Sequence, residues 1–482
     1  MQIKGIPTDY KKVNSDILIV GIYEGSKDKR FSELLKDENF KGKKGELLLL
    51  NSDSKLKAKK IAFLGLGKEK ELTRDIIRDG LASCARMAVK KEKSKLAVLI
   101  EAKNIEADIL GQTIAEGIIL GEYKFKGYHK KDEDKEKWKG IRDVVVIVKS
   151  SSEEKKVNVG AKVGKIVAEA ENRARDLVNA PANIATPEFI SAHAQKIAKE
   201  EKLKIQILDP QKEGMGLFWS VARGAKNKAK LVAIRYNGDP KNKKELIAII
   251  GKGVTFDSGG ISIKPSGKMY EMKMDMSGSA AVIEGMKAIS QLKIKKNILV
   301  LAPLTENMPD GDASRPGDVA TGLDGTTVEI ISTDAEGRMI LADAITYAKN
   351  VGATKIFDCA TLTGGCVIAL GDIASGLLGN DDDFIKEIED AADKSGQKVW
   401  HLPIFEEYKD YLKSNVADLK NCTDRGMASA SVGAVFLQRF VGETPWVHLD
   451  IAGTAYQDKV RGSYGDGGTG VPLRTIVEWL RS

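Results

Sequence analysis

The stretch Ile247-Ala-Ile-Ile-Gly-Lys-Gly-Val-Thr-Phe-Asp-Ser-Gly-Gly260 joins a short apolar run to a glycine-rich loop that carries one lysine and one aspartate. Short apolar runs of this kind are typical of strands that are buried inside a sheet. In open α/β sheets, ligand sites form at the carboxyl ends of such strands. The stretch therefore predicts a buried strand with Lys252 and Asp257 at a functional site just beyond its end.

The rest of the second half of the chain alternates apolar runs with amphipathic helical patterns, which indicates an α/β fold. The other predicted strands are Ile298–Leu301, Lys355–Ala360 and Trp446–Ile451, and the clearest predicted helices are Ala280–Leu292 and Met339–Lys349.

The first third shows a similar alternation and predicts a second α/β domain with a largely parallel sheet. Its predicted strands are Ile17–Ile22, Glu46–Leu50, Lys60–Leu66, Leu96–Glu101 and Val144–Lys149, and its predicted helices are Thr73–Val89 and Gly111–Tyr123. A length of 482 residues also favours two domains. The polar stretch Ser150–Lys156 is predicted to be a linker, followed by a helix over Val159–Asn179. We place the boundary between residues 156 and 157.

Composition limits the class of protein. Hydrophobic residues make up 42% and charged residues 30%, which is typical of a soluble globular chain. We expect a cytoplasmic protein without membrane partners, because there is no run of about 18 apolar residues and no apolar signal core in Met1–Tyr10.

The chain has four cysteines, and we expect them to be reduced, buried thiols. A Cys359–Cys366 disulfide is the less favoured alternative. The net charge of +8 permits nucleic-acid binding, but lysines mixed with acids, as in Lys90–Lys95, favour a solvated surface.

Three segments carry the residues that could bind ligands or take part in catalysis, and each follows an apolar run or precedes a helix. They are residues 251–260, residues 263–275 and Ser332-Thr-Asp-Ala-Glu-Gly-Arg338. Convergence of these segments would assemble four carboxylates, those of Asp257, Asp275, Asp334 and Glu336. Carboxylates close together raise one another's pKa, and divalent cations relieve that repulsion. Oxygen ligands suit Mn²⁺ and Mg²⁺, and Zn²⁺ also accepts them.

The residues around Asp334 leave alternatives open. Asp334 and Glu336 are two positions apart, so an extended segment would point both to one side, whereas Asp334 alone would read as a helix cap. Gly337 and Arg338 at a helix start favour an anion, although a lone arginine more often forms a surface ion pair. Lys252 and Lys264 could be ordinary surface lysines. A phosphate-binding loop is disfavoured because the G-x-x-x-x-G-K-[ST] spacing is missing.

At these residues the chain resembles the leucyl aminopeptidase family, also called the cytosol aminopeptidases. Residues 332–338 are similar to the family signature Asn-Thr-Asp-Ala-Glu-Gly-Arg, with Ser332 in place of asparagine. Residues 251–260 and Ile261-Ser-Ile-Lys-Pro-Ser266 are similar to its metal and catalytic-lysine segment. Further similar segments are Asn179-Ala-Pro-Ala-Asn183, Glu306-Asn-Met-Pro309, Arg315-Pro-Gly-Asp318, Ala360-Thr-Leu-Thr-Gly364 and Asp450-Ile-Ala-Gly-Thr454. The first third carries no such motif, and only its position and α/β pattern assign it to the family's macro-like domain.

The resemblance implies two α/β domains: a smaller macro-like domain over residues 1–156 and a larger catalytic domain over residues 157–482, with a mixed sheet flanked by helices. It implies two divalent metal ions per chain, and the cluster of four carboxylates without histidines favours Mn²⁺ over Zn²⁺ or Mg²⁺. The residues implied for one metal are Lys252, Asp257, Asp275 and Glu336, and those for the other are Asp257, Asp334 and Glu336. As a ligand, Lys252 has to be a neutral amine.

The resemblance also implies the remaining site residues. Lys264 and Arg338 form the catalytic pair, and a bicarbonate is held by Gly337, Arg338 and Leu362. The residues implied for the pocket of the substrate's first side chain are Met272, Thr361 and Gly364. We therefore expect a leucyl-type aminopeptidase that acts on peptides with a free N-terminus, as a homohexamer. A two-metal phosphoesterase and a DNA-binding regulator, a second role known among bacterial relatives, are the alternatives.

Overall fold

The computed structural model describes residues 1–26, 28–129, 139–423 and 426–482, which form two compact units. Unit 1 contains Met1–Glu169 and Lys459–Gly465, and unit 2 contains Ala170–Asp458 and Asp466–Ser482. Each unit is a sheet packed with helices, so the predicted fold class is confirmed. The units divide inside helix α4 (Ser151–Asn179), and the boundary between residues 156 and 157 stays a prediction.

In the part of unit 1 that the structure describes, six strands form one sheet in the order β1-β6-β5-β2-β4-β3. The strands are β1 (Gln2–Pro7), β2 (Ile17–Tyr23), β3 (Leu47–Asn51), β4 (Lys60–Gly67), β5 (Lys95–Leu99) and β6 (Asp143–Val148). All neighbours pair in parallel except β3, which runs antiparallel to β4. The largely parallel sheet is therefore confirmed. β1 was not predicted, because most of its side chains are at least partly exposed and give no apolar run.

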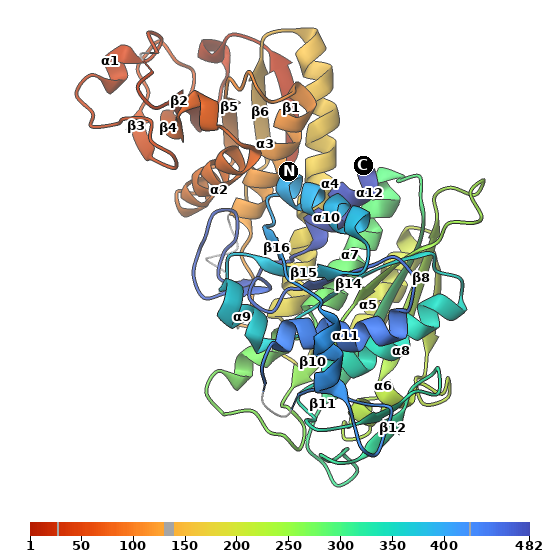
Figure 1. The fold of residues 1–482 in the computed structure, drawn as a ribbon. Coiled ribbons are helices and arrows are strands. Elements are labelled where there is room, and N and C mark those ends of the chain that lie inside the picture. Colours follow the sequence, from red (N-terminus) through yellow and green to blue (C-terminus); the bar gives the residue numbers. More distant parts are fainter. Residues whose placement is uncertain (27, 130–138, 424–425) are drawn as a thin grey trace. The chain divides into compact units, whose positions relative to one another are not determined.

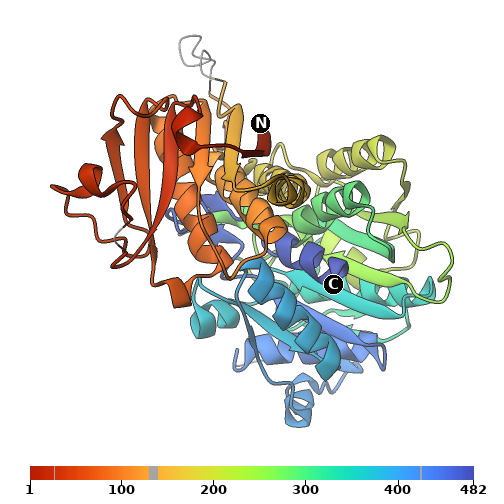
Figure 2. The same cartoon turned by 90° about the horizontal axis from the view of Figure 1, so that it is seen from above.

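Helices α2 (Arg74–Lys90) and α3 (Ala107–Glu122) pack side by side against this sheet, as Figure 2 shows. Thr73 caps α2, since its hydroxyl accepts a hydrogen bond from the Ile76 amide at 3.4 Å. The two helices approach closely at Gly117, where a Cβ atom would lie 2.7 Å from the Arg78 carbonyl oxygen. The short helix α1 (Ser32–Leu35) lies between β2 and β3 in the chain.

The prediction of a linker over Ser150–Lys156 is wrong, because residues from Ser151 onward belong to α4. The Ser150 hydroxyl accepts a hydrogen bond from the Glu153 amide at 3.2 Å, and Glu153 and Glu154 lie in the first turn. Serine and acidic residues are favoured at a helix N-terminus. The polar composition therefore marks the start of an exposed helix.

In the described part of unit 2, nine strands form a mixed sheet in the order β16-β15-β18-β14-β9-β11-β8-β7, with β10 also paired to β11. The strands are β7 (Lys204–Leu208), β8 (Lys230–Asn237), β9 (Ile247–Gly251), β10 (Gly253–Asp257), β11 (Asn297–Asn307), β14 (Lys355–Ala360), β15 (Ser375–Gly379), β16 (Val399–His401) and β18 (Trp446–Asp450). The central strands β18, β14, β9 and β11 are parallel, so their carboxyl ends lie at one edge.

Helices cover both faces of this sheet (Figure 1). One layer contains α5 (Pro187–Glu200), α7 (Ser277–Leu292), α10 (Asp382–Ser395) and α12 (Leu473–Arg481), and the other contains α6 (Gly216–Ala222), α8 (Glu336–Asn350) and α11 (Ser429–Val441). Smaller elements are α9 (Gly364–Leu370), a three-stranded sheet of β12 (Val319–Thr321), β13 (Thr327–Glu329) and β17 (Leu419–Lys420), and the pair β19 (Tyr456–Gln457) and β20 (Gly467–Gly468). The predicted strands and helices of this half are all present.

The cysteines are free thiols, so the alternative of a Cys359–Cys366 disulfide is wrong. Cys84, Cys359 and Cys366 are buried, and Cys422 is half-buried. Burial raises the pKa of the Cys84 thiol to about 12. Within the described ranges, no helix is long and apolar enough to cross a membrane.

A buried acid network in unit 2 predicts a pH-dependent stability. The Glu284 side chain of α7 is fully buried, and its carboxylate lies 2.7 Å from Arg173 Nε and 2.6 Å from His193 Nε2. Burial alone would raise the pKa of Glu284, but His193 and Arg173 outweigh it and hold the pKa below its usual value. The ionised form therefore stabilises the fold above the unfolded-state pKa of about 4.3, and this contribution is lost as pH falls through the folded-state pKa.

We expect the difference in unfolding free energy between the unaltered protein and Glu284→Gln to be largest above about pH 5 and to shrink as pH falls below about 4. Denaturant unfolding at a series of pH values, with a chelator in every sample, measures this difference. A difference that stays constant from neutral to acid pH would show that Glu284 does not titrate as the network implies.

Candidate active site

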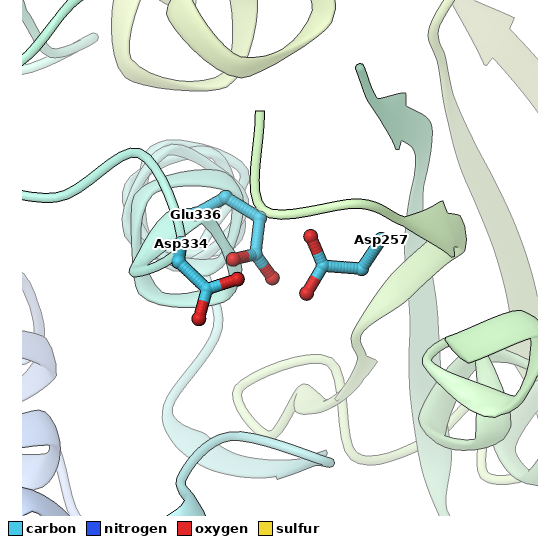
Figure 3. Close-up of side chains that lie close together, drawn as sticks. All are labelled: Asp257, Asp334 and Glu336. Carbon is cyan, nitrogen blue, oxygen red and sulfur yellow. The ribbon is translucent and has the colours of Figure 1, made fainter. Parts of the chain in front are cut away.

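Three carboxylates from two segments meet at the carboxyl edge of the sheet in unit 2. The oxygens of Asp257, Asp334 and Glu336 lie within 4.8 Å of one another, and Figure 3 shows their side chains pointing toward a common centre. Asp257 ends β10, whereas Glu336 begins α8 and Asp334 lies two residues before it. Asp257 and Glu336 are buried, but the Asp334 side chain is 37% exposed, so the cluster opens to solvent on that side.

Lys252 joins the fourth carboxylate, Asp275, to this cluster. Its Nζ lies 2.8 Å from Asp275 Oδ2 and 2.7 Å from Glu336 Oε1, and it donates a hydrogen bond to the Thr361 carbonyl oxygen at 2.9 Å. The Thr361 hydroxyl donates to Asp275 Oδ1 at 2.7 Å and so fixes that carboxylate. A Cβ at Gly337 would lie 2.7 Å from Lys252 Nζ, so a larger residue there would push the amine away from its position.

Lys264 is the second cation of the site. Its Nζ lies 2.8 Å from Asp257 Oδ2 and 2.5 Å from Asp334 Oδ1, and its side chain is partly exposed. The structure therefore brings together Lys252, Lys264 and all four carboxylates that the sequence predicted, which excludes the reading of these two lysines as surface residues.

Burial and mutual repulsion shift the pKa of these groups. Burial raises the pKa of Asp275, and burial with the nearby Asp257 charge raises the pKa of Glu336 and of Asp334. Burial alone would lower the pKa of each lysine, but the surrounding carboxylates outweigh it and raise the pKa of both Lys252 and Lys264. In the metal-free arrangement, each lysine therefore lies where the surrounding carboxylates favour its charged form.

The residues present fit divalent metal ions. Asp275 Oδ2 and Glu336 Oε1 are buried, and both lie against one cation, Lys252 Nζ, at 2.8 Å and 2.7 Å. In the described part of the chain, the four carboxylates thus face two lysine cations, and buried carboxylates need compensating positive charge. Carboxylate oxygens and one amine nitrogen form a donor set that Mn²⁺, Zn²⁺ and Mg²⁺ accept to different degrees. The four histidines do not lie among these residues.

Arg338 provides a buried cationic group beside the carboxylates, in the first turn of α8. Its Nη1 donates a hydrogen bond to the Asn421 carbonyl oxygen at 2.9 Å, whereas its Nε is buried and, in the described part of the chain, has no hydrogen-bond partner. Burial lowers the pKa of Arg338, with Cys422, Glu336 and Asp450 opposing that effect. A buried, partly unpaired guanidinium at a helix start fits a small anion.

The residues predicted for the substrate and anion pockets lie in or beside short elements of unit 2. Met272 belongs to a 3-10 helix over Met269–Met274, Thr361 and Leu362 follow β14, and Gly364 begins α9. The Leu362 amide donates a hydrogen bond to Asp450 Oδ1 at 3.1 Å. The structure thus places Thr361 against a carboxylate of the cluster, while the pocket roles of Met272, Gly364 and Leu362 stay predictions.

Sequence reasoning missed three polar residues that fix the site. Asn307 donates to Asp257, the Asn421 side chain bonds the backbone at Ile331 and Ser332, and Asp450 accepts hydrogen bonds from Leu362 and Thr363. Asn307 and Asp450 lie in two of the segments that carry the family resemblance, and this was the available signal. Their types alone imply no role, because their partners come close only in the fold.

Comparison with known proteins identifies the family. The sequence model of the cytosol aminopeptidase family catalytic domain matches residues 172–477, and the model of that family's N-terminal domain matches residues 20–132. The chain belongs to the cytosol aminopeptidase family. The resemblance noted in the sequence is therefore confirmed, and the two matches fall on the two α/β parts of the chain.

Relatives of the family share the full length of the chain. A probable cytosol aminopeptidase of Alkaliphilus oremlandii is 42% identical, with 100% of this chain and 99% of that protein covered. A probable cytosol aminopeptidase of Aquifex aeolicus is 40% identical, with 100% and 98% covered. The similarity to the family thus includes the first third, where the sequence carried no motif.

Solved structures of similar proteins have the same fold. The bottromycin maturation enzyme BotP in complex with Mn is 32% identical, with a TM-score of 0.87 and with 97% of this chain and 99% of that chain covered. A mutant of tomato leucine aminopeptidase is 30% identical, with a TM-score of 0.88 and with 100% and 96% covered.

Proposed function

We propose that this member of the cytosol aminopeptidase family is a metal-dependent, leucyl-type aminopeptidase that removes the N-terminal residue from peptides. The observation that carries the proposal is the cluster of Asp257, Asp334 and Glu336, with Lys252 and Lys264 in contact with it. Four carboxylates with two cations suit hydrolytic metal chemistry better than simple anion binding. By family membership, we further propose a homohexamer that acts in the cytoplasm.

Two divalent ions, of which Mn²⁺ is our first choice, would be held in overlapping ligand sets. Lys252 and Asp275 would serve one ion, Asp334 would serve the other, and Asp257 and Glu336 would serve both. Such ions supply Lewis acidity that polarises a carbonyl and lowers the pKa of bound water. The Mn complex of the similar enzyme BotP supports the choice of metal.

Lys252 couples metal loading to a proton. Its pKa is raised by its carboxylate neighbours, so they favour the protonated amine when no metal is bound. An ammonium has no lone pair, and ligation therefore requires that this proton leave. Proton binding to Lys252 therefore competes with metal binding, and this competition grows as pH falls.

Lys264 and Arg338 would act on the reacting groups. Lys264 lies beside Asp257 and Asp334 and remains a cation, which suits it to stabilise negative charge on the substrate carbonyl oxygen. Arg338, whose Nε has no hydrogen-bond partner among the described residues, would hold a bicarbonate, which would supply a general base. The backbone at Leu362, whose amide is held by Asp450 Oδ1 at 3.1 Å, and the helix start at Gly337 would complete that anion site.

The same chemistry explains why the substrate would need a free N-terminus. The metal pair needs neutral or anionic donors from the substrate, and an unprotonated α-amine is such a donor. Acylation removes this donor and adds bulk. Met272, Thr361 and Gly364 would then surround the first side chain, which gives the leucyl-type preference.

We expect chelation to abolish hydrolysis of leucine amide and added Mn²⁺ to restore it, because the cluster of carboxylates requires divalent charge to act. The measurement is the initial rate before chelation, after removal of the chelator, and after metal addition. N-acetyl-leucine amide is the matched control and should not be hydrolysed. Equal rates on both amides would rule out the free-amine requirement, and full activity after chelation would rule out the metal mechanism.

A further inference from the structure

Asn307 ends β11 at the carboxyl edge of the sheet and is buried beside the carboxylate cluster. Its Nδ2 donates one hydrogen bond to Asp257 Oδ1 at 2.8 Å and another to the Thr333 carbonyl oxygen at 3.0 Å. Both partners are acceptors, so only the NH₂ end of the amide can face them. This fixes the orientation of the Asn307 side chain.

The amide in turn fixes the carboxylate plane of Asp257. Asp257 Oδ1 accepts hydrogen bonds from Asn307 Nδ2 and from the Gly259 amide at 2.9 Å, whereas Oδ2 lies against Lys264 Nζ. Two neutral donors therefore hold one oxygen and direct the other toward the cluster. Partners of this kind orient metal-ligating carboxylates and tune their basicity.

Asn307 also sets the spacing between the two segments that carry the cluster. Its own carbonyl oxygen accepts hydrogen bonds from the Ser258 amide at 3.0 Å and the Ser258 hydroxyl at 2.7 Å, while its side chain holds Thr333, the neighbour of Asp334. A Cβ at Gly260 would lie 2.7 Å from Asn307 Oδ1, so the loop passes close to the amide on a second side. One residue thus connects the loop after β10 with the segment before α8.

We propose that Asn307 is a positioning residue that sets the affinity of the site for divalent metal by holding the Asp257 carboxylate at a fixed position relative to Asp334. This inference rests on the proposed function, because it takes Asp257 and Asp334 to be metal ligands. Asn307 is assigned no contact with metal or substrate. Its effect is transmitted through the Asp257 carboxylate and the Thr333 carbonyl.

The test is a titration of chelator-treated protein with Mn²⁺ alone, followed by the rise in unfolding temperature that binding to the folded state produces. For Asn307→Ala we expect about 10- to 100-fold weaker Mn²⁺ binding, the range that loss of a ligand's hydrogen-bond partner usually causes. The measurement does not depend on catalysis.

Asn297→Ala is the matched control. Asn297 begins the same strand and is buried to a similar degree, and its Nδ2 also donates two hydrogen bonds, to the carbonyl oxygens of Asp239 at 2.8 Å and Asn242 at 2.7 Å. Its loss should lower the unfolding temperature without changing the Mn²⁺ affinity. A merely structural role for Asn307 would make the two variants behave alike.

Unchanged Mn²⁺ affinity in Asn307→Ala, or an equal loss in Asn297→Ala, would overturn the inference. If Asn307→Ala does not fold, Asn307→Leu keeps most of the volume but no donor, and the same weakening is expected of it. Wild-type affinity in that variant would also overturn the inference. Failure of the unaltered protein to bind Mn²⁺ would instead contradict the metal site itself, and with it the proposed function.

Discussion

Glu336→Gln is expected to abolish turnover and to reduce the metal content of the protein while the fold is retained. Glu336 is buried at the start of α8, its Oε1 lies 2.7 Å from Lys252 Nζ, and it is the proposed shared ligand of both ions. Glutamine has nearly the same shape but no charge to offset two dications. We expect kcat to fall by more than about 10³-fold, beyond the range that a single electrostatic donor supplies.

Asp343→Asn provides the control for this prediction. Asp343 lies on the same helix, is buried, and accepts hydrogen bonds from the Phe218 and Leu323 amides, away from the cluster. The control should lose stability but keep its metal and its kcat. Metal content by elemental analysis and kcat on leucine amide are measured for both variants. Full metal occupancy with normal turnover in Glu336→Gln would refute the ligand assignment.

The sequence predicted those site residues whose position at the end of a strand or the start of a helix follows from the local pattern alone. Periodicity alone predicts the place of such a residue in the fold. Asp257 follows a predicted buried strand, and Glu336 lies at the start of a predicted helix. The parallel order of β18, β14, β9 and β11 then brings the segments to one edge. The fold class and the convergence of the carboxylates could therefore be predicted.

Residues whose roles depend on contacts between distant segments could not be predicted. Asn307 matters because the Asp257 carboxylate and the Thr333 carbonyl both lie within hydrogen-bond distance of its amide, and neither distance can be obtained from periodicity. The predicted linker over Ser150–Lys156 failed for a local reason. A polar run reads equally well as a loop or as the exposed first turns of a helix, and the capping bond at Ser150 decides for the helix.

Lys264→Ala is expected to lower kcat by about 10²–10³-fold, roughly 3–4 kcal/mol, without loss of metal. Lys264 Nζ lies between Asp257 Oδ2 and Asp334 Oδ1, and these carboxylates keep its pKa raised, so it is a cation throughout the neutral range. Its removal takes one positive charge away from two proposed ligands. Their mutual repulsion then grows, and a dication relieves that repulsion more than before.

Metal affinity should therefore be unchanged or higher in Lys264→Ala, while the transition state loses the charge that stabilises the carbonyl oxygen. A lower kcat together with an unchanged or higher metal affinity distinguishes a catalytic lysine from a lysine that supports metal binding. The control is Lys268→Ala, an exposed lysine of the same loop that pairs with Asp458 and Glu271 outside the cluster. The measurements are kcat, KM and Mn²⁺ affinity for both variants. A raised KM at normal kcat in Lys264→Ala would show that Lys264 serves binding and not the chemical step. Weaker Mn²⁺ binding in that variant would show the same.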